Sequence, residues 1–381
     1  MMHRSARMIP QIGLWIAALL APAVQAAEPA PAARDHALDA SCMAKDGLRP
    51  ICGVPFPEDV EPVPGTTSVI ASDMHLHMGP AGIEQQPGVL KRVDLRTAKV
   101  SPLYPAPLML PGRPDWGDPA CPGEIGAKLL PHGINLSRRT DGAWQLLVVN
   151  HGSRESVEVF ELVRVRHDWA LRWRGCAVAP ASSHLNDVAA LPGGGFLVTT
   201  MHMGRNDETR AAAVKAANGE NTGFLWRWEP GKAFVRQPGS DAPMPNGVQT
   251  DAFGRFAYIN TASRGGDVRK LDLASGQIVG SVVVPNPDNA SWTRDGRLLV
   301  AGVAAGPKPM VCFNKPEAPC PFASEVYAIN VAVMPARRLF AYKGAPVNAA
   351  TVAVQFGNSL LIGSAFGDSI VEVPRQFGPG K

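Results

Sequence analysis

Short apolar runs separated by turn residues dominate the hydrophobic pattern of this chain. An apolar run, such as 144–150 or 196–200, is followed by a turn and then by another run. Turns such as Asp141-Gly142 and Asp295-Gly296 contain residues that tolerate the backbone conformations of tight β-hairpins. The pattern therefore predicts short antiparallel strands rather than long helices.

The runs recur as similar units, which predicts an all-β fold, a six-bladed β-propeller. Two packed β-sandwiches are the competing arrangement. We favour the propeller because polar residues recur at the start of the first strand of successive units, and those starts meet at one opening of a propeller axis. The units contain the predicted strands 67–71 and 89–95; 133–136, 144–150 and 157–163; 187–191, 196–200 and 224–229; 247–250, 256–260 and 268–273; 290–293, 298–303 and 325–329; and 350–355, 359–363 and 369–373.

The clearest candidate for a helix is the Ala-rich segment 208–217, which lies inside an insertion at 203–222. A parallel α/β fold would need amphipathic helices between its strands, and few other segments could supply them. The segment is either a surface insertion or a cap over one mouth of the central channel.

The N-terminal residues have the pattern of an export signal. Arg4 and Arg7 precede a short apolar stretch at 12–20, and Val24-Gln25-Ala26 fits a small-residue cleavage site. An uncleaved anchor is the alternative, although the stretch is short for a bilayer-spanning helix. We expect a signal peptide at 1–26, an arm or linker at 27–50 and the propeller at 51–381, in a bacterial protein that is periplasmic or secreted and has no stable membrane insertion.

Charge and cysteine content agree with export. Removing the two arginines of 1–26 lowers the basic count from 37 to 35 against 33 acidic residues, and this net charge of +2 does not favour a nucleic-acid partner. Six cysteines predict three disulfides, with many possible pairings. The shortest loops would join Cys42 to Cys52 and Cys312 to Cys320, which leaves Cys121 for Cys176. No Cys-x-x-Cys spacing supports a zinc-thiolate or redox site.

Amide and carboxylate side chains recur where first strands begin. Each alone is unremarkable, because Asn and Asp are common where a chain turns into a strand. At equivalent positions of a propeller their oxygens would converge, and Ca²⁺ prefers such oxygen ligands. The pair Glu58-Asp59, in a proline-rich segment, is either a solvated turn or a source of further negative charge. The recurring residues, which predict a central calcium site, are Asn186, Asp187, Asn246, Asp288 and Asn289.

Histidines supply candidate acid–base groups. His132 and His151 flank strands of the second unit, where one could take a proton from water and pass charge to the other. No Gly-x-Ser-x-Gly elbow and no dinucleotide-binding fingerprint occurs. The remaining candidates are His75 and His77, which alternate but lack a third metal ligand, and His184 and His202, which we regard only as substrate contacts.

Several phrases together resemble the paraoxonases, a family of calcium-dependent lactonases and arylesterases with a six-bladed β-propeller. The resemblance extends from about residue 58 to about residue 373. It rests on Glu58-Asp59, Pro131-His132-Gly133-Ile134, 147–151, 185–187, Asn246-Gly247, Asp288-Asn289 and 360–363.

The resemblance implies two calcium ions and a histidine dyad acting on a small-molecule lactone or ester. His132 would be the general base and His151 its partner. The family's disulfide between first and last strands has no C-terminal cysteine here, so closure must rest on strand pairing. The catalytic calcium would be held by Glu58, Asn186, Asn246, Asp288 and Asn289, and the structural calcium by Asp59, Asp187 and the backbone carbonyl of Ile134.

Two other functions are compatible with the sequence. One is a non-catalytic, calcium-stabilised propeller that binds a ligand or a protein. The other is a single-metal sugar lactonase of the gluconolactonase type, which shares Asn246-Gly247, although Asp59 and Asp187 favour two metals. Calcium-dependent stability without hydrolysis would identify the first, and metal stoichiometry the second. The natural substrate and the oligomeric state do not follow from the sequence.

Overall fold

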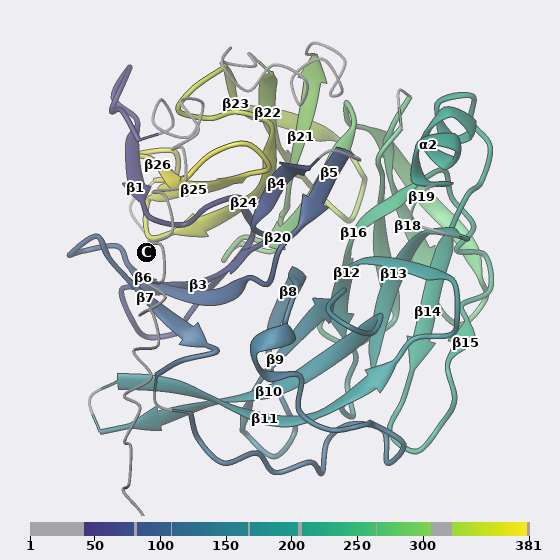
Figure 1. Ribbon diagram of the computed structural model, residues 1–381. Helices are drawn as coiled ribbons and strands as arrows, with labels where there is room; N and C mark the ends of the chain where they lie inside the picture. The colour runs from purple at the N-terminus through teal and green to yellow at the C-terminus, as the bar shows by residue number, and fades with distance from the viewer. Residues whose placement is uncertain are drawn as a thin grey trace, which may run out of the picture. The chain divides into compact units, whose positions relative to one another are not determined.

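Four-stranded antiparallel sheets surround a common centre, and their inner strands lie nearest to it (Figure 1). The computed structural model describes residues 42–79, 82–107, 109–166, 168–204, 208–263, 265–305 and 322–378. All of these belong to one compact unit, 35–381. Six such sheets are described, which confirms the all-β six-bladed propeller.

Each blade runs from an inner strand at the axis to an outer strand at the rim. The first contains β2 (Pro57–Pro62), β3 (Ser68–Asp73), β6 (Val89–Asp94) and β7 (Lys99–Tyr104). The second contains β8 (Pro131–Arg138), β9 (Trp144–Asn150), β10 (Ser156–Val165) and β11 (Asp168–Val178). The third contains β12 (Ser183–Ala190), β13 (Phe196–Met203), β14 (Phe224–Trp228) and β15 (Val235–Arg236).

The remaining blades follow the same order. The fourth contains β16 (Pro245–Thr250), β17 (Phe256–Thr261), β18 (Asp267–Asp272) and β19 (Gln277–Val283). The fifth contains β20 (Pro287–Trp292), β21 (Leu298–Ala305), β22 (Ala323–Ile329) and β23 (Ala336–Lys343). The sixth contains β24 (Ala350–Phe356), β25 (Ser359–Ser364), β26 (Ser369–Val373) and β1 (Arg49–Cys52). The elements outside the blades are a hairpin of β4 (Leu76–Gly79) and β5 (Gly82–Gln85), a 3-10 turn η1 (Gly126–Lys128) and α2 (Thr209–Ala217).

The sixth blade joins the two ends of the propeller. The N-terminal strand β1 pairs antiparallel with β26, from Arg49 opposite Glu372 to Cys52 opposite Ser369. Closure therefore rests on strand pairing, as the sequence predicts. Strand β1 therefore overlaps the last two residues of the arm predicted at 27–50. A disulfide between Cys42 and Cys52 ties the segment before β1 to that strand.

The disulfide predictions agree with the structure wherever it describes the cysteines. Cys121 is bonded to Cys176 on β11, and Cys42 to Cys52. Cys312 and Cys320 lie outside the described residues. Two disulfides are typical of proteins from an oxidising compartment. Residues 1–41, which hold the predicted signal peptide, are also outside the described part, and no described helix has the length and hydropathy needed to cross a bilayer.

The hydrophobic core lies between neighbouring blades. Leu147 and Val149 of the second blade pack with Leu185, Phe196 and Trp228 of the third. A sheet covered on both faces buries both sets of its side chains. The strand 144–150 accordingly has a continuous apolar run, with residues 146–149 fully buried, instead of strict alternation. This burial between blades holds the inner strands in place around the axis.

Two local predictions have different outcomes. The helix predicted at 208–217 is confirmed as α2, and it packs Ala212 and Ala216 against Met244, directly before β16. Of the two alternatives for Glu58-Asp59, the solvated turn is excluded, because these residues are buried in β2. Because proline and acidic residues are uncommon in strands, the sequence of β2 does not have a strand pattern. Pro57 occupies its first position, where a missing N–H is tolerated.

Candidate functional site

In every blade the pairing between the inner strand and the second strand shifts register near the start of the inner strand. The register with the second strand shifts between Pro57 and Val60 in β2 and between Pro131 and Ile134 in β8. Bulges of this kind re-aim side chains and are common beside active sites. In all six blades the two residues inside the shift are released from the ladder: 58–59, 132–133, 186–187, 246–247, 288–289 and 351–352. Five of these pairs contain the residues predicted from the sequence.

Strained backbone leads into most of these strands. The residue directly before the inner strand has a left-handed φ in five blades, for example 48° at Phe56 and 65° at Ser182. Such a conformation costs a non-glycine residue on the order of 1–3 kcal/mol, and packing must hold it in place. The full set is Phe56, Ser182, Met244, Asn286 and Ala349.

Two bulges contain glycine because the next blade approaches too closely for a side chain. A Cβ atom on Gly133 would lie 2.6 Å from Asp187 Oδ1, and one on Gly247 would lie 2.4 Å from the carbonyl oxygen of Asp288. Real Cβ atoms do not approach other atoms so closely. The Pro-His-Gly and Asn-Gly phrases thus let adjacent bulges pack against one another.

Five residues from four of these bulges carry amide or carboxylate oxygens, and we call them the oxygen ring: Glu58, Asn186, Asn246, Asp288 and Asn289. Asn289 Nδ2 donates to Glu58 Oε1 at 2.7 Å, which joins the fifth blade to the first. Asn260 of β17 donates to the backbone carbonyl of Asp288. These contacts join the fifth blade to the first and fourth blades, and the assignment of all five residues to one calcium stays a prediction.

Unpartnered oxygens are concentrated in the oxygen ring. Glu58 is 2% exposed, Asn289 1% and Asn186 3%. Buried side-chain oxygens without a hydrogen-bond partner are rare and destabilising, so a group of them indicates a missing ligand. Within the oxygen ring this applies to Oε2 of Glu58 and to Oδ1 of Asn186, Asn246 and Asn289, and elsewhere in the described residues it also applies to Oδ1 of Asp73 and Asn260. Their donor chemistry fits a hard cation such as Ca²⁺.

Buried carboxyl groups also lie at the bulges of the inner strands. Burial, followed by the charges of Glu58 and Asp59, raises the pKa of Asp288 well above its usual value. Burial and the charge of Asp59 do the same for the pKa of Asp187. Among the described residues no cluster of three or more His, Cys, Asp or Glu side chains is arranged to hold a metal. A cation here would therefore depend on amide oxygens, which Ca²⁺ accepts and transition metals rarely use.

The second residues of two bulges, Asp59 and Asp187, lie one position deeper. Asp59 accepts backbone N–H groups from Val60 at 2.8 Å and from Ile134 at 2.7 Å. Asp187 accepts from Val188 at 2.7 Å and from Val248 at 2.8 Å. Burial and the charge of Glu58 raise the pKa of Asp59 to about 7. The contact of Ile134 seen here is made by its N–H, whereas the sequence predicts a role for its carbonyl.

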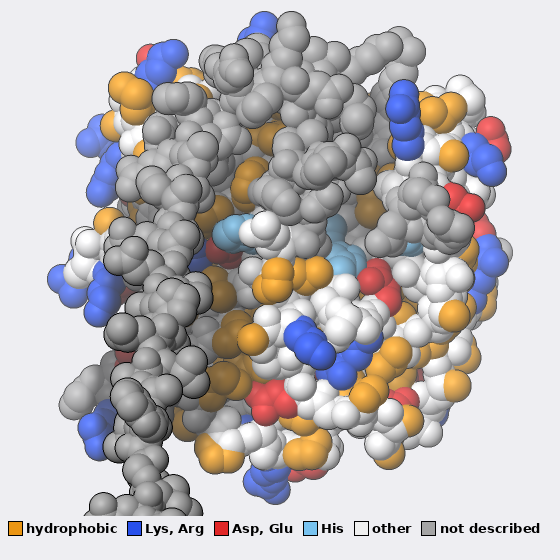
Figure 2. All heavy atoms as spheres, in the orientation of Figure 1, with side chains coloured by type: hydrophobic (Ala, Val, Ile, Leu, Met, Phe, Trp, Pro, Cys, Tyr) orange, Lys and Arg blue, Asp and Glu red, His pale blue; other side chains and the backbone are white. Residues whose placement is uncertain are grey.

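The predicted histidine pair is in direct contact beside the oxygen ring. His132 Nδ1 lies 2.8 Å from His151 Nε2. The other nitrogen of His132, Nε2, lies 3.3 Å from Asn186 Nδ2 and 3.5 Å from Glu58 Oε1. Burial opposes protonation of His132, but the charge and hydrogen bonding of Glu58 outweigh it and raise its pKa. Figure 2 shows histidine side chains beside acidic ones near the centre of this face.

One functional candidate, Glu155, is missed by sequence reasoning. Its carboxylate lies 2.9 Å and 3.0 Å from His151 Nδ1. The hairpin between β9 and β10 places this residue four positions after His151. A carboxylate four residues after a histidine in a strand-to-strand turn is the signal that could have identified it.

The other histidines are less closely connected to the oxygen ring. His184 and His202 are stacked, with ring centroids 4.1 Å apart. Burial and the charge of His202 lower the pKa of His184. His75 Nδ1 lies 3.8 Å from Asp73 Oδ1, and the side chain of His77 is outside the described part. These positions leave the substrate-contact prediction for His184 and His202 untested.

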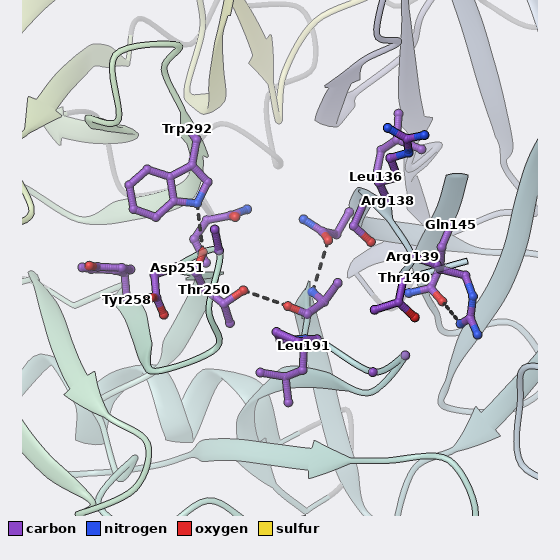
Figure 3. Close-up of a pocket in the computed structure, with 18 of the residues that line it drawn as sticks. Leu136, Arg138, Arg139, Thr140, Gln145, Leu191, Thr250, Asp251, Tyr258 and Trp292 are labelled. Atoms are coloured by element: carbon purple, nitrogen blue, oxygen red, sulfur yellow. Dashed lines mark hydrogen bonds between the residues drawn. The ribbon is translucent and has the colours of Figure 1, made fainter. Parts of the chain in front are cut away.

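A separate cavity of about 750 Å³ opens at the opposite ends of the same inner strands (Figure 3). Asn186 lies near the start of β12, whereas Ala190 and Leu191 at its end line the cavity. Its polar groups are paired with one another. Trp292 Nε1 donates to the carbonyl of Thr250 at 3.0 Å, and Thr250 Oγ1 donates to the carbonyl of Ala190 at 2.8 Å.

Solved structures that are similar to this chain include the following three. A hydrazine synthase from Kuenenia stuttgartiensis is 17% identical over 81% of this chain and 74% of its own, with a TM-score of 0.42. The calcium-binding protein regucalcin from Agrobacterium tumefaciens is 13% identical over 87% and 95%, with a TM-score of 0.44. A Bacteroides thetaiotaomicron protein of unknown function is 11% identical over 85% and 74%, with a TM-score of 0.48. Sequence identities and TM-scores this low say nothing about the activity of this chain.

Sequence comparison gives the family. No curated protein matches the chain. The arylesterase family model matches residues 57–371, which include all six inner strands, the oxygen ring and the histidine pair. The chain therefore belongs to the arylesterase family.

Proposed function

We propose that this protein is an exported, calcium-dependent hydrolase of lactones and carboxylic esters, with the oxygen ring as its metal site. The observation that carries the proposal is the set of buried, unpartnered oxygens of Glu58, Asn186, Asn246 and Asn289 beside a histidine pair. Membership of the arylesterase family supports ester chemistry. The two disulfides support an oxidising compartment such as the periplasm.

The oxygen ring would hold the catalytic calcium through Glu58, Asn186, Asn246, Asp288 and Asn289. A calcium ion there supplies positive charge for the carbonyl oxygen of the substrate and for the oxyanion that develops on attack. Between them, Glu58 and Asp288 bring two negative charges to offset that of the ion. The amides add neutral oxygens, which keeps the net charge of the site low.

The histidine pair would move the proton. His132 presents Nε2 beside Asn186 and Glu58, so a water placed there could give its proton to this nitrogen. His151 contacts the other nitrogen of His132 and can spread the positive charge that results. Both rings are only partly exposed, which limits competition from bulk water.

We also propose a second, structural calcium at Asp59, Asp187 and the carbonyl of Ile134. Two buried carboxylates one position below the oxygen ring, with raised pKa values, support this proposal. Their bonds to the backbone of the next blade leave further lone pairs on each carboxylate. Metal stoichiometry by mass spectrometry under native conditions tests it: two bound ions are expected, and one would indicate the single-metal type.

The first experiment is hydrolysis of an aliphatic lactone and of phenyl acetate by the purified protein. We expect activity with calcium, loss after chelation and recovery on addition of calcium. A folded, calcium-loaded protein that hydrolyses neither compound would contradict the proposal and point to a non-catalytic propeller. Activity that survives chelation would remove the metal from the mechanism.

A further inference from the structure

Glu155 holds the histidine pair from the side opposite the oxygen ring. Its two carboxylate oxygens lie 3.0 Å and 2.9 Å from His151 Nδ1. His151 Nε2 in turn lies 2.8 Å from His132 Nδ1. Glu155 is itself fixed, because its Oε1 accepts the backbone N–H of Leu185 at 2.8 Å. The three side chains form one continuous row of contacts that ends at His132 Nε2.

The ionisation of Glu155 determines which nitrogens carry hydrogen. Burial opposes that ionisation, but the contact with His151 and the amide of Leu185 keep the pKa of Glu155 below its usual value. An ionised carboxylate only accepts hydrogen bonds, so His151 must donate from Nδ1. In a neutral imidazole the other nitrogen is then an acceptor. His132 must therefore donate from Nδ1, which leaves a lone pair on its Nε2.

We propose that Glu155 is a positioning residue that sets the tautomers of both histidines and thereby leaves His132 Nε2 free to accept a proton. This inference rests on the proposed hydrolase function and deepens it. It differs from the dyad predicted from the sequence, in which His151 alone supports His132. The row of contacts makes the unit a carboxylate–histidine–histidine triad.

The proton balance of the step is simple. Water gives one proton to His132 Nε2, and its oxygen forms a bond to the carbonyl carbon of the ester. When the bond from that carbon to the leaving oxygen breaks, the same proton passes from Nε2 to the leaving oxygen. The Nδ1 protons of His132 and His151 stay in place, and Glu155 remains ionised. Its charge stabilises the imidazolium through His151, as the aspartate does in serine protease triads.

Glu155 also connects the histidines to the oxygen ring. The Leu185 N–H that it accepts belongs to the residue before Asn186. Asn186 Nδ2 lies 3.3 Å from His132 Nε2, at the other end of the row. Both ends of the triad are thus fixed by consecutive residues of β12, which holds the proton acceptor at a constant position relative to the oxygen ring.

The test is Glu155→Gln, which keeps the shape and removes the charge. The Leu185 N–H would keep the single amide oxygen as its acceptor, so the amide NH₂ would face His151 and reverse both tautomers. We expect kcat to fall by about 10²–10⁴, as for the equivalent change in a serine protease. KM and the calcium-induced shift in melting temperature should not change. Glu155→Asp, which keeps the charge on a shorter side chain, should recover part of the rate.

Glu161→Gln is the matched control. This glutamate lies nearby on β10 but contacts Arg172 at 3.2 Å and Arg174 at 2.7 Å, away from the histidines. Its kcat should stay within about threefold of that of the parent protein. A Glu155→Gln variant that is equally active would overturn the inference.

The tautomers are measurable without activity. Histidine ¹⁵N NMR of the parent protein should show His151 and His132 protonated at Nδ1, and Glu155→Gln should move both protons to Nε2. A parent protein with His151 protonated at Nε2 would overturn the inference even if the protein is an active hydrolase. Conversely, a protein with the expected tautomers and no hydrolysis would contradict the proposed function alone.

Discussion

The two mouths of the propeller channel are built from opposite ends of the same strands, yet they differ in how their polar groups are satisfied. At the oxygen ring, four buried side-chain oxygens have no hydrogen-bond partner. At the opposite cavity, Asn135, Thr250 and Trp292 are hydrogen bonded to the backbone. The polar side chains of the first mouth are thus only partly paired within the described residues, whereas these three side chains of the second mouth are paired.

The difference arises from one local feature of the inner strands. At the oxygen ring each inner strand is bulged, so two residues per blade lose their partners in the sheet. Beyond the bulge regular pairing resumes, as from Val248 opposite Ile259 to Thr250 opposite Ala257. Side chains at the bulges are therefore free to bind a ligand, whereas those at the far mouth belong to an ordinary sheet. Four predictions test this contrast.

The largest effect is expected for His132→Gln. Loss of a general base typically reduces turnover by about 10²–10⁴. Calcium binding should persist, because the oxygen ring is unchanged. Lactone hydrolysis and calcium-dependent melting measure the two properties separately. Unchanged lactonase rates would remove His132 as the base.

Asn246→Leu and Gln249→Leu compare the two ends of one strand, β16. Asn246 has an unpartnered oxygen, so its replacement should abolish most of the stabilisation by calcium and weaken calcium affinity by about 10–100-fold. Gln249 donates to the carbonyl of Ala290 at 3.1 Å, and its loss should cost about 1–3 kcal/mol with or without calcium. Calcium titrations followed by melting temperature distinguish them. Equal calcium responses in both variants would contradict the assignment of the ring.

The pH dependence of calcium stabilisation is a third test. Asp59 has its pKa raised from 3.8 to about 7, so the folded state binds protons more tightly than the unfolded state does. Without calcium, stability should therefore fall as pH rises between these values. Calcium competes with those protons and should raise the melting temperature more at about pH 8 than at about pH 5.5. An equal shift at both values would show that the buried carboxylates do not bind the ion.

The smallest effect is expected at the far mouth. Arg294 is exposed, and its backbone N–H donates to Gln355 Oε1. Arg294→Ala should change stability by no more than about 0.5 kcal/mol and leave ester hydrolysis unaltered. Thermal melts and steady-state kinetics check this. A clear loss of hydrolysis would give the cavity a role in catalysis and break the contrast between the mouths.

Sequence reasoning identified the blades because turn residues and apolar runs are local signals. It did not predict the strand of Glu58-Asp59, which contains two prolines and three acidic residues and so lacks a strand pattern. It also passed over Glu155, because the spacing of four residues after His151 does not by itself show that the two side chains meet. Its relation to His151 depends on the geometry of the hairpin between β9 and β10.

The sequence by itself determined the repeating strands, the polar residues at the strand starts and the family to which they belong, and it favoured the two described disulfides among many possible pairings. These depend on residue type and spacing along the chain. Only the tertiary structure decided that the inner strands bulge at one level, that Asn289 reaches Glu58 across 231 positions, and that Glu155 stands behind the histidine pair. The reason is physical: burial between blades fixes the positions of residues that are remote in sequence, and no local pattern encodes those distances.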